Sequence, residues 1–245
     1  MCRSCLLICL TAFLVPTDRS FAADEATGYL KIEPKTDKAK TEIIRYAPRE
    51  GDLVFYDDHS LMWTLLFAYA GTGSPLHMGI VVKKTDGSFA VLEAGPDDTV
   101  RVALLDLDKR LPQFDKDFAG NITIRRCKKE LTKDQSAALT KFAHAQDGKR
   151  YAIGRLLLQG TWLRSRGPLR ELVLGRTDLD RDSWICSELC VAASVVAKLL
   201  DGKTIYANST YRRDLIDNER HDLSAGWHDA AAWLALRPKD GAEKK

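Results

Sequence analysis

We expect a helix to begin within the stretch Trp184-Ile185-Cys186-Ser187-Glu188-Leu189-Cys190. Asp182 and Ser183, just before it, are favoured N-cap residues, and apolar residues then recur at three- and four-residue steps as far as Leu200. Cys186 therefore falls in the first helical turn, where unpaired backbone N–H groups and the helix dipole stabilise a thiolate. From this position alone, a nucleophilic cysteine and an inert buried cysteine both remain open.

A β-hairpin is predicted upstream, over residues 77–94. Strand-forming residues lie on both sides of the turn pair Asp86-Gly87. Antiparallel pairing makes His77 and Glu93 opposite neighbours, because the two lie about equally far from the turn. A thiol nucleophile needs a base within hydrogen-bond reach, and the base needs an acceptor that orients it. The sequence therefore offers Cys186, His77 and Glu93 as a candidate triad.

Simpler roles for these residues stay open at this point. His77 fits a core histidine whose hydrogen bonds are satisfied, and Glu93 fits a strand-end carboxylate paired with Arg101. Cys190, one helical turn beyond Cys186, raises a metal site in which both cysteines and His77 bind zinc. Because no fourth ligand is evident, we expect no metal and no cofactor.

Several segments together resemble a known family, the YiiX/YebB-like, circularly permuted NlpC-type cysteine hydrolases. The resemblance covers roughly residues 49–200 in the family's order. Its segments are Gly51-Asp52-Leu53-Val54-Phe55, His77-Met78-Gly79-Ile80-Val81, Val91-Leu92-Glu93-Ala94, Gly148-Lys149-Arg150-Tyr151 and Cys186-Ser187-Glu188-Leu189. It implies an α+β, permuted papain-like fold, with a mainly antiparallel sheet, packed helices and the nucleophile at a helix N-terminus.

The resemblance also implies roles for individual residues. Cys186 would be the nucleophile, His77 the general base and then the acid, and Glu93 the group that orients the imidazole. Tyr151 matches a tyrosine that lines the family's active site, and we add Tyr56, which ends the predicted strand 53–56, as a second substrate-binding candidate. The backbone N–H of Cys186 is an expected oxyanion donor. Ala152 departs from the family, where an acidic residue is common.

One folded domain is expected, since the 245 residues are 45% hydrophobic. Residues 1–23 are predicted to be a secretory signal peptide, because Arg3 precedes an apolar run and Ser20-Phe21-Ala22-Ala23 resembles a cleavage site. We expect residues 24–46 to form a charged, weakly ordered entry segment, residues 47–237 the hydrolase domain, and residues 238–245 a disordered tail. The protein is thus predicted to be exported, periplasmic or secreted.

Net charge limits the classes of binding partner that we expect, and the number of cysteines limits the possible disulfides. Residues 1–23 carry Arg3, Arg19 and Asp18, a net +1, so their removal lowers the formal charge from +3 to +2. Acidic and basic residues are interspersed, so we expect no nucleic-acid partner. Three cysteines remain after residue 23, an odd number that leaves at least one thiol unpaired within the monomer.

The remaining segments are assigned more coarsely. Residues 61–70 are apolar and predict a buried helix or the wall of an apolar groove, while residues 105–118 are interpreted as a charged connection. A capping-box pattern at Thr132 predicts a helix that runs to residue 147. Residues 152–181 hold six arginines among leucines and predict a helical insertion or lid, with a solvated basic face favoured over an anion site.

These observations predict an exported cysteine hydrolase. It would cleave an amide bond, in a peptide or a peptidoglycan-derived substrate, through an acyl-enzyme. Two alternatives stay open. One is a lipid-directed acyl hydrolase or acyltransferase, with a lipid-linked substrate and contact with a membrane surface. The other is a non-catalytic binding module on the same fold.

Overall fold

The computed structural model describes residues 28–34, 40–95, 99–118, 121–167, 173, 179, 181–218 and 220–235. The predicted signal peptide, residues 1–23, and the predicted tail, residues 238–245, lie outside these ranges. No helix in the described ranges is long and apolar enough to cross a membrane.

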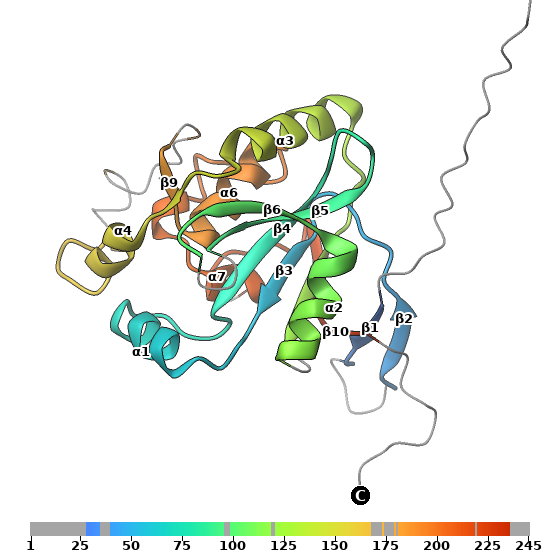
Figure 1. Cartoon of the computed structure of the whole chain (residues 1–245), viewed down its shortest axis with the longest axis horizontal. Helices are drawn as coiled ribbons and strands as arrows, with labels where there is room; N and C mark the ends of the chain where they lie inside the picture. The colour runs from blue at the N-terminus through green and yellow to red at the C-terminus, as the bar shows by residue number, and fades with distance from the viewer. Residues whose placement is uncertain are drawn as a thin grey trace, which may run out of the picture.

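An eight-stranded antiparallel sheet forms the centre of the molecule, in the order β2-β1-β10-β7-β3-β4-β5-β6 (Figure 1). Its strands are β1 (Tyr29–Ile32), β2 (Glu42–Arg45), β3 (Leu53–Tyr56), β4 (His77–Lys83), β5 (Phe89–Ala94), β6 (Val102–Asp106), β7 (Ile122–Cys127) and β10 (Trp227–Leu234). A separate parallel pair joins β8 (Arg150–Tyr151) to β9 (Ser183–Trp184). The predicted α+β class with a mainly antiparallel sheet is confirmed.

Helices cover both faces of the sheet (Figure 1). They are α1 (Leu61–Tyr69), α2 (Leu107–Asp117), α3 (Lys133–Gln146), α4 (Ile153–Leu158), α6 (Cys186–Val196), the 3-10 helix η2 (Ala207–Ser209) and α7 (Arg212–Ile216). Side chains alternate along the central strands. On β3, Leu53 and Phe55 join the core under α3 and α6, whereas Val54 and Tyr56 join the core under α2.

The motif Gly51-Asp52 fixes the start of β3. Asp52 is fully buried and its carboxylate accepts hydrogen bonds from the Tyr46 hydroxyl at 2.9 Å, from Arg49 N at 3.0 Å and from Cys127 N at 2.6 Å. Burial raises the pKa of Asp52 to about 6, although these hydrogen bonds act to lower it. The carboxylate therefore joins β3 to β7 and to the segment after β2 and has a structural role.

The segment 24–46 differs from its prediction as a weakly ordered entry. Its strands β1 and β2 extend the central sheet, and Leu30 and Tyr46 are fully buried. Strand β1 pairs with β10, which lies about two hundred residues later in the chain, so no local pattern could reveal it. Burial of apolar side chains at this edge outweighs the charge of the surrounding lysines.

Residues 105–118, interpreted as a charged connection, instead hold α2. Leu107, Leu111 and Phe114 repeat at helical spacing and are buried against the sheet. Of the charged residues between them, Asp108 and Lys109 are exposed whereas Arg110 is buried, and Pro112 is tolerated inside the helix. The helix α3 follows its prediction, because Thr132 accepts from Gln135 N and the Gln135 side chain accepts from Thr132 N.

Candidate active site

Cys186 is the first residue of α6 and is 1% exposed. The predicted caps are wrong in detail, because Ser183 belongs to β9 and the N-cap position is held by Ile185. Glu188 completes the start of the helix, its carboxylate accepting from Ile185 N at 3.2 Å. As the N1 residue, Cys186 has a backbone N–H with no acceptor inside the helix. The thiol therefore lies at the positive end of the helix dipole, as predicted.

His77 and Glu93 come together, but in a register that differs from the predicted one. Gly79, not His77, lies opposite Glu93 in the β4–β5 pair. The Glu93 side chain reaches diagonally across Gly79, and His77 Nε2 donates to Glu93 Oε2 at 2.9 Å. A side chain at residue 79 would block this path, since a Cβ there would lie 2.8 Å from Glu93 Cγ. His77 begins β4 at the end of the sheet, where it also meets Cys186 from the other layer.

The pKa values of Cys186 and His77 shift in opposite directions. Burial alone raises the pKa of the Cys186 thiol, but the charge of Arg212 and a hydrogen bond with His77 lower it to about 7. Burial acts to lower the pKa of His77, but hydrogen bonds with Cys186 and Glu93 raise it to about 9. Because Nε2 faces Glu93, Nδ1 is the ring nitrogen left for the thiol. The lowered thiol pKa and the raised imidazole pKa together favour the thiolate–imidazolium pair over the neutral pair.

Arg110, on α2, is a second partner of the Glu93 carboxylate, and the sequence analysis did not identify it. Its Nε donates to Glu93 Oε1 at 3.1 Å and its Nη2 to Glu93 Oε2 at 3.0 Å, with both side chains buried. The pKa of Glu93 falls to about 2, because His77 and Arg110 outweigh the burial that acts to raise it. Arg110 therefore takes the place of Arg101, which donates to Gly148 O instead.

Arg212, on α7, is a second site residue that the sequence analysis missed. It is 2% exposed, with Nη1 3.6 Å from Cys186 Sγ, Nε donating to Pro75 O at 2.8 Å, and the guanidinium 3.7 Å from the centre of the Phe67 ring. Within the described residues, its Nη2 is buried with no hydrogen-bond partner. A fixed cation with one unused donor thus lies beside the thiol.

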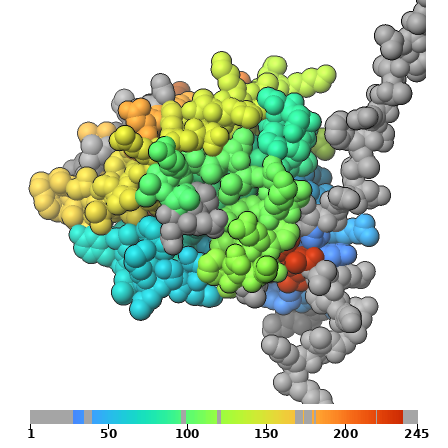
Figure 2. All heavy atoms as spheres, in the orientation of Figure 1, coloured from blue at the N-terminus to red at the C-terminus, as the bar shows by residue number. Residues whose placement is uncertain are grey.

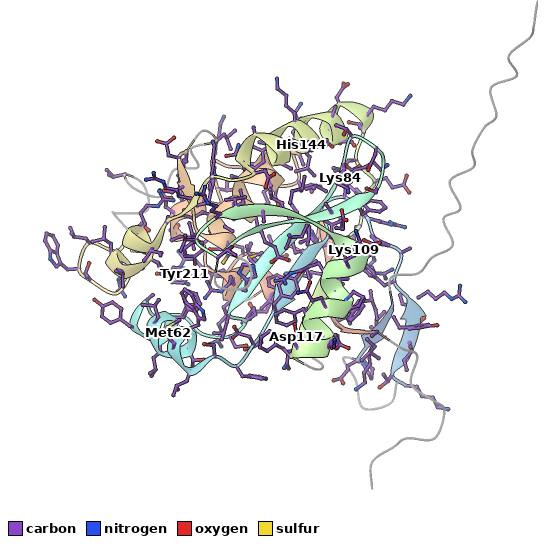
Figure 3. The ribbon with its side chains drawn as sticks, viewed as in Figure 1. Met62, Lys84, Lys109, Asp117, His144 and Tyr211 are labelled. Atoms are coloured by element: carbon purple, nitrogen blue, oxygen red, sulfur yellow. The ribbon has the colours of Figure 1, made fainter. Side chains whose placement is uncertain are left out.

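A cleft of about 580 Å³ opens over His77, between α1 on one side and α2 on the other. Figure 3 labels a lining residue of each side, Met62 on α1 and Asp117 at the end of α2. The lining is largely apolar, with Trp63, Phe67, Leu76, Val100, Phe114, Phe118 and Ile153. The prediction that residues 61–70 form either a buried helix or a groove wall resolves in favour of the wall, since Phe67 is the buried residue of α1.

The predicted substrate-binding tyrosines both line this cleft. Tyr151 is partly exposed and borders Gly95, whose added Cβ would lie 2.8 Å from the Tyr151 ring. Tyr56 is fully buried and lies between His77, with ring centres 5.7 Å apart, and the guanidinium of Arg110 at 5.3 Å. Tyr56 therefore holds the imidazole and the arginine in place and has little surface of its own for a substrate.

The other cysteines differ from Cys186. Burial raises the pKa of both the Cys127 and the Cys190 thiols, and neither cysteine forms a disulfide in the described structure. No three His, Cys, Asp or Glu side chains in the described part of the chain gather as metal ligands, and this includes Cys186, Cys190 and His77. The zinc set considered from the sequence is therefore not assembled.

The predicted insertion, residues 152–181, is described only in part. The structure assigns internal partners to three of its arginines. Arg155 and Arg181 lie 2.6 Å and 3.5 Å from Glu188 Oε2, and Arg166 lies 2.9 Å from Asp214. The expectation of a solvated basic face over a core stripe holds only in part, because Leu156 is buried and Arg164 is exposed, whereas Leu157, Leu158 and Leu163 are exposed. The predictions for residues 168–172, 174–178 and 180 lie outside the described residues.

The close approach at Gly79 gives the first testable prediction. Gly79→Ala places a Cβ 2.5 Å from Val91 Cγ2 and 2.8 Å from Glu93 Cγ, so Glu93 must leave His77. We expect the pKa of His77 to fall below 9, measured by NMR titration, with stability reduced by about 1–3 kcal/mol in urea unfolding. Gly154→Ala, with no atom within 4 Å, is the matched control. An unchanged His77 pKa in Gly79→Ala would contradict this assignment.

No protein-family model matches the sequence, and no curated protein matches it. Among solved structures, the chain is similar to a crystal structure of the metalloprotein yiiX from Escherichia coli O157:H7. The two share 19% sequence identity with a TM-score of 0.42, over 62% of this chain and 67% of that chain.

Proposed function

We propose that this protein is a cysteine hydrolase with Cys186 as nucleophile, His77 as acid and base, and Glu93 as the orienting group. The observation that supports this most is the geometry at the start of α6, where Cys186 meets His77, His77 Nε2 donates to Glu93 at 2.9 Å, and Arg212 Nη1 lies 3.6 Å from the sulfur. A buried pair held in its charged form by Arg212 and Glu93 is the activated state that a thiol nucleophile needs.

In the first step, the Cys186 thiolate attacks the substrate carbonyl, forming a C–S bond and a tetrahedral oxyanion. The backbone N–H of Cys186 and the unpaired Nη2 of Arg212 are the proposed donors to that oxygen. His77 Nδ1 then gives its proton to the leaving amine as the C–N bond breaks. An acyl-enzyme with a thioester at Cys186 results.

In the second step, neutral His77 takes a proton from water, whose oxygen attacks the thioester. The C–S bond breaks, the acyl group leaves as a carboxylic acid, and thiolate and imidazolium are restored. Glu93 keeps its negative charge throughout, since its pKa is about 2. Its hydrogen bond to Nε2 keeps Nδ1 directed at the thiol in both steps.

An amide in a peptide or a peptidoglycan-derived fragment remains our first proposed substrate, acted on after export. The cleft lining favours a second candidate, an acyl ester or lipid-linked amide, because an apolar cavity of about 580 Å³ suits a hydrocarbon chain better than a polar glycopeptide. Both candidates use the same thiol and differ in the leaving group.

Alkylation tests the nucleophile. At pH 7.5, iodoacetamide should modify Cys186 about 10-fold faster than Cys127 or Cys190, because their thiols have raised pKa values. The rate should rise with pH through a midpoint near 7, read by mass spectrometry of the digested protein. If Cys186 reacts no faster than a small free thiol, and His77→Ala changes nothing, the protein is better described as a binding module.

Product analysis separates the two substrate classes. Wild-type protein and the Cys186→Ser variant are each incubated with a cell-wall digest and with a phospholipid mixture. New amines that depend on Cys186 would support amide hydrolysis, whereas fatty-acid release or transfer without amines would support the lipid-directed alternative.

A further inference from the structure

Exposed apolar side chains gather on the two segments beside the cleft mouth. Of the large hydrophobic residues exposed in the described structure, four lie on α1 and five within residues 153–163. Leu61, Leu65 and Trp162 have 72%, 62% and 76% of their surface exposed. A monomer rarely leaves such a group of side chains in water unless the surface has a partner.

The two segments form one continuous surface. The Tyr69 ring of α1 lies directly against Gly160, where an added Cβ would be 2.0 Å from the ring. Figure 2 shows α1, in cyan, and residues 153–167, in yellow, side by side at one end of the molecule. We call this surface, α1 together with residues 153–163, the apolar lip.

Within the two segments of the apolar lip the charged side chains are basic, whereas the acidic Asp58 and Asp117 line the neighbouring cleft. Residues 61–71 and 152–167 contain arginines but no acidic residue. Arg164 is exposed and forms no ion pair with any described residue that the structure records. With Arg166, Arg220 and Tyr211, it lines a second concavity of about 580 Å³ at the end of α1. Figure 3 labels Tyr211 there, between α1 and α4. Guanidinium groups in a concavity beside apolar side chains suit a phosphate that carries acyl chains.

We infer that the apolar lip docks on the surface of a lipid bilayer that contains anionic phospholipids. Its leucines and Trp162 would enter the boundary between headgroups and acyl chains, and the concavity at Arg164 and Arg220 would hold a lipid phosphate. We favour the bilayer over a protein partner because anionic headgroups place phosphate directly beside hydrocarbon, which matches guanidinium groups beside exposed leucines.

Docking of the apolar lip would bring the mouth of the cleft against the bilayer. Met62 and Ile153 belong both to the apolar lip and to the cleft lining, so the cleft opens at the docked surface. A lipid-linked substrate could then pass from the bilayer to His77 without crossing water. This consequence rests on the proposed function, whereas the docking itself needs no reactive thiol.

The test uses vesicles of phosphatidylcholine with and without phosphatidylglycerol. Because residues 5–15 are apolar and can bind lipid by themselves, the readout must be specific to the apolar lip. Trp162 and the partly exposed Trp63, which both belong to the apolar lip, supply this readout, since Trp184, Trp227 and Trp233 are at most 1% exposed; Trp162 is the more exposed of the two. We expect lipids brominated on the acyl chains to quench the fluorescence of the full chain, more strongly with phosphatidylglycerol, and to quench Trp162→Phe much less.

Variants complete the test. Leu65→Asp with Trp162→Asp should lower vesicle binding at least about 10-fold and leave alkylation of Cys186 unchanged, because neither residue lines the cleft. Ala137→Asp, an exposed position on α3, is the control for added charge. Urea unfolding midpoints equal to that of the wild type would show that the variants are folded.

Three results would overturn the docking proposal: no quenching of Trp162, wild-type vesicle binding by the double variant, or a lipid-independent dimer that the double variant abolishes. Vesicle binding by Cys186→Ala at the wild-type level separates this proposal from the hydrolase proposal.

Discussion

Arg212→Met should raise the pKa of the Cys186 thiol well above 7 and slow its alkylation at pH 7.5 about 10- to 30-fold. The charge of Arg212 is the largest influence that lowers this pKa, and its Nη1 lies 3.6 Å from the sulfur. Without it, burial raises the thiol pKa, and His77 is the main charged group left to oppose this rise. The measurement is the pH dependence of the alkylation rate.

Controls for this prediction come from the same helix. Arg213 is exposed, so Arg213→Met should leave the thiol pKa near 7. Because Arg212 also holds Pro75 O, an unfolding curve must show that Arg212→Met is folded. Added guanidinium should restore the alkylation rate of Arg212→Ala, which a merely structural role would not explain. A thiol pKa still near 7 in folded Arg212→Met would contradict the assigned electrostatic role.

Arg110→Met should destabilise the fold by about 3–5 kcal/mol at pH 7, because it leaves the buried Glu93 carboxylate without its bidentate partner. The free energy of unfolding in urea measures the loss. In the variant, the pKa of Glu93 rises, so the loss should be smaller at pH 4, where the variant binds a proton that the wild-type carboxylate does not.

The neighbouring residue supplies the matched control. Lys109 has an exposed side chain that pairs with Asp106, so Lys109→Met should cost less than about 1 kcal/mol. Combining Arg110→Met with Glu93→Gln should recover part of the loss, because the uncompensated charge is gone. A loss in Arg110→Met no larger than that in Lys109→Met would show that the ion pair does not stabilise the fold.

The sequence predicts Cys186 and His77 as candidate nucleophile and base. It does not predict Arg212 and Arg110, the arginines that contact Cys186 and Glu93. Arg110 was detectable in principle, because Leu107, Leu111 and Phe114 mark the buried face of α2, yet the charged residues between them concealed the helical pattern. Arg212 gave no local signal. Its partners Pro75 and Cys186 lie 137 and 26 residues away, and only the folded chain brings them together.

The register of the β4–β5 pair was the second feature that the sequence did not predict correctly. Distance from the turn at Asp86-Gly87 predicted that His77 pairs with Glu93, and both residues do lie on one face of the hairpin. The actual pairing is two residues different, which keeps the same face because side chains alternate with period two. Only the contact with Gly79 shows why a longer diagonal reach is allowed.

The placement of β10 between β1 and β7 determines when this chain can complete its fold. Tyr29 pairs with Leu234, so the first described strand has no place in the sheet until the last one has been made. During synthesis, β3 to β7 can assemble while the β1–β2 pair still lacks β10, the strand that joins it to the rest of the sheet. Loss of residues 227–234 would therefore detach both ends of the described chain at once, while leaving the hairpin that carries His77 and Glu93 in place.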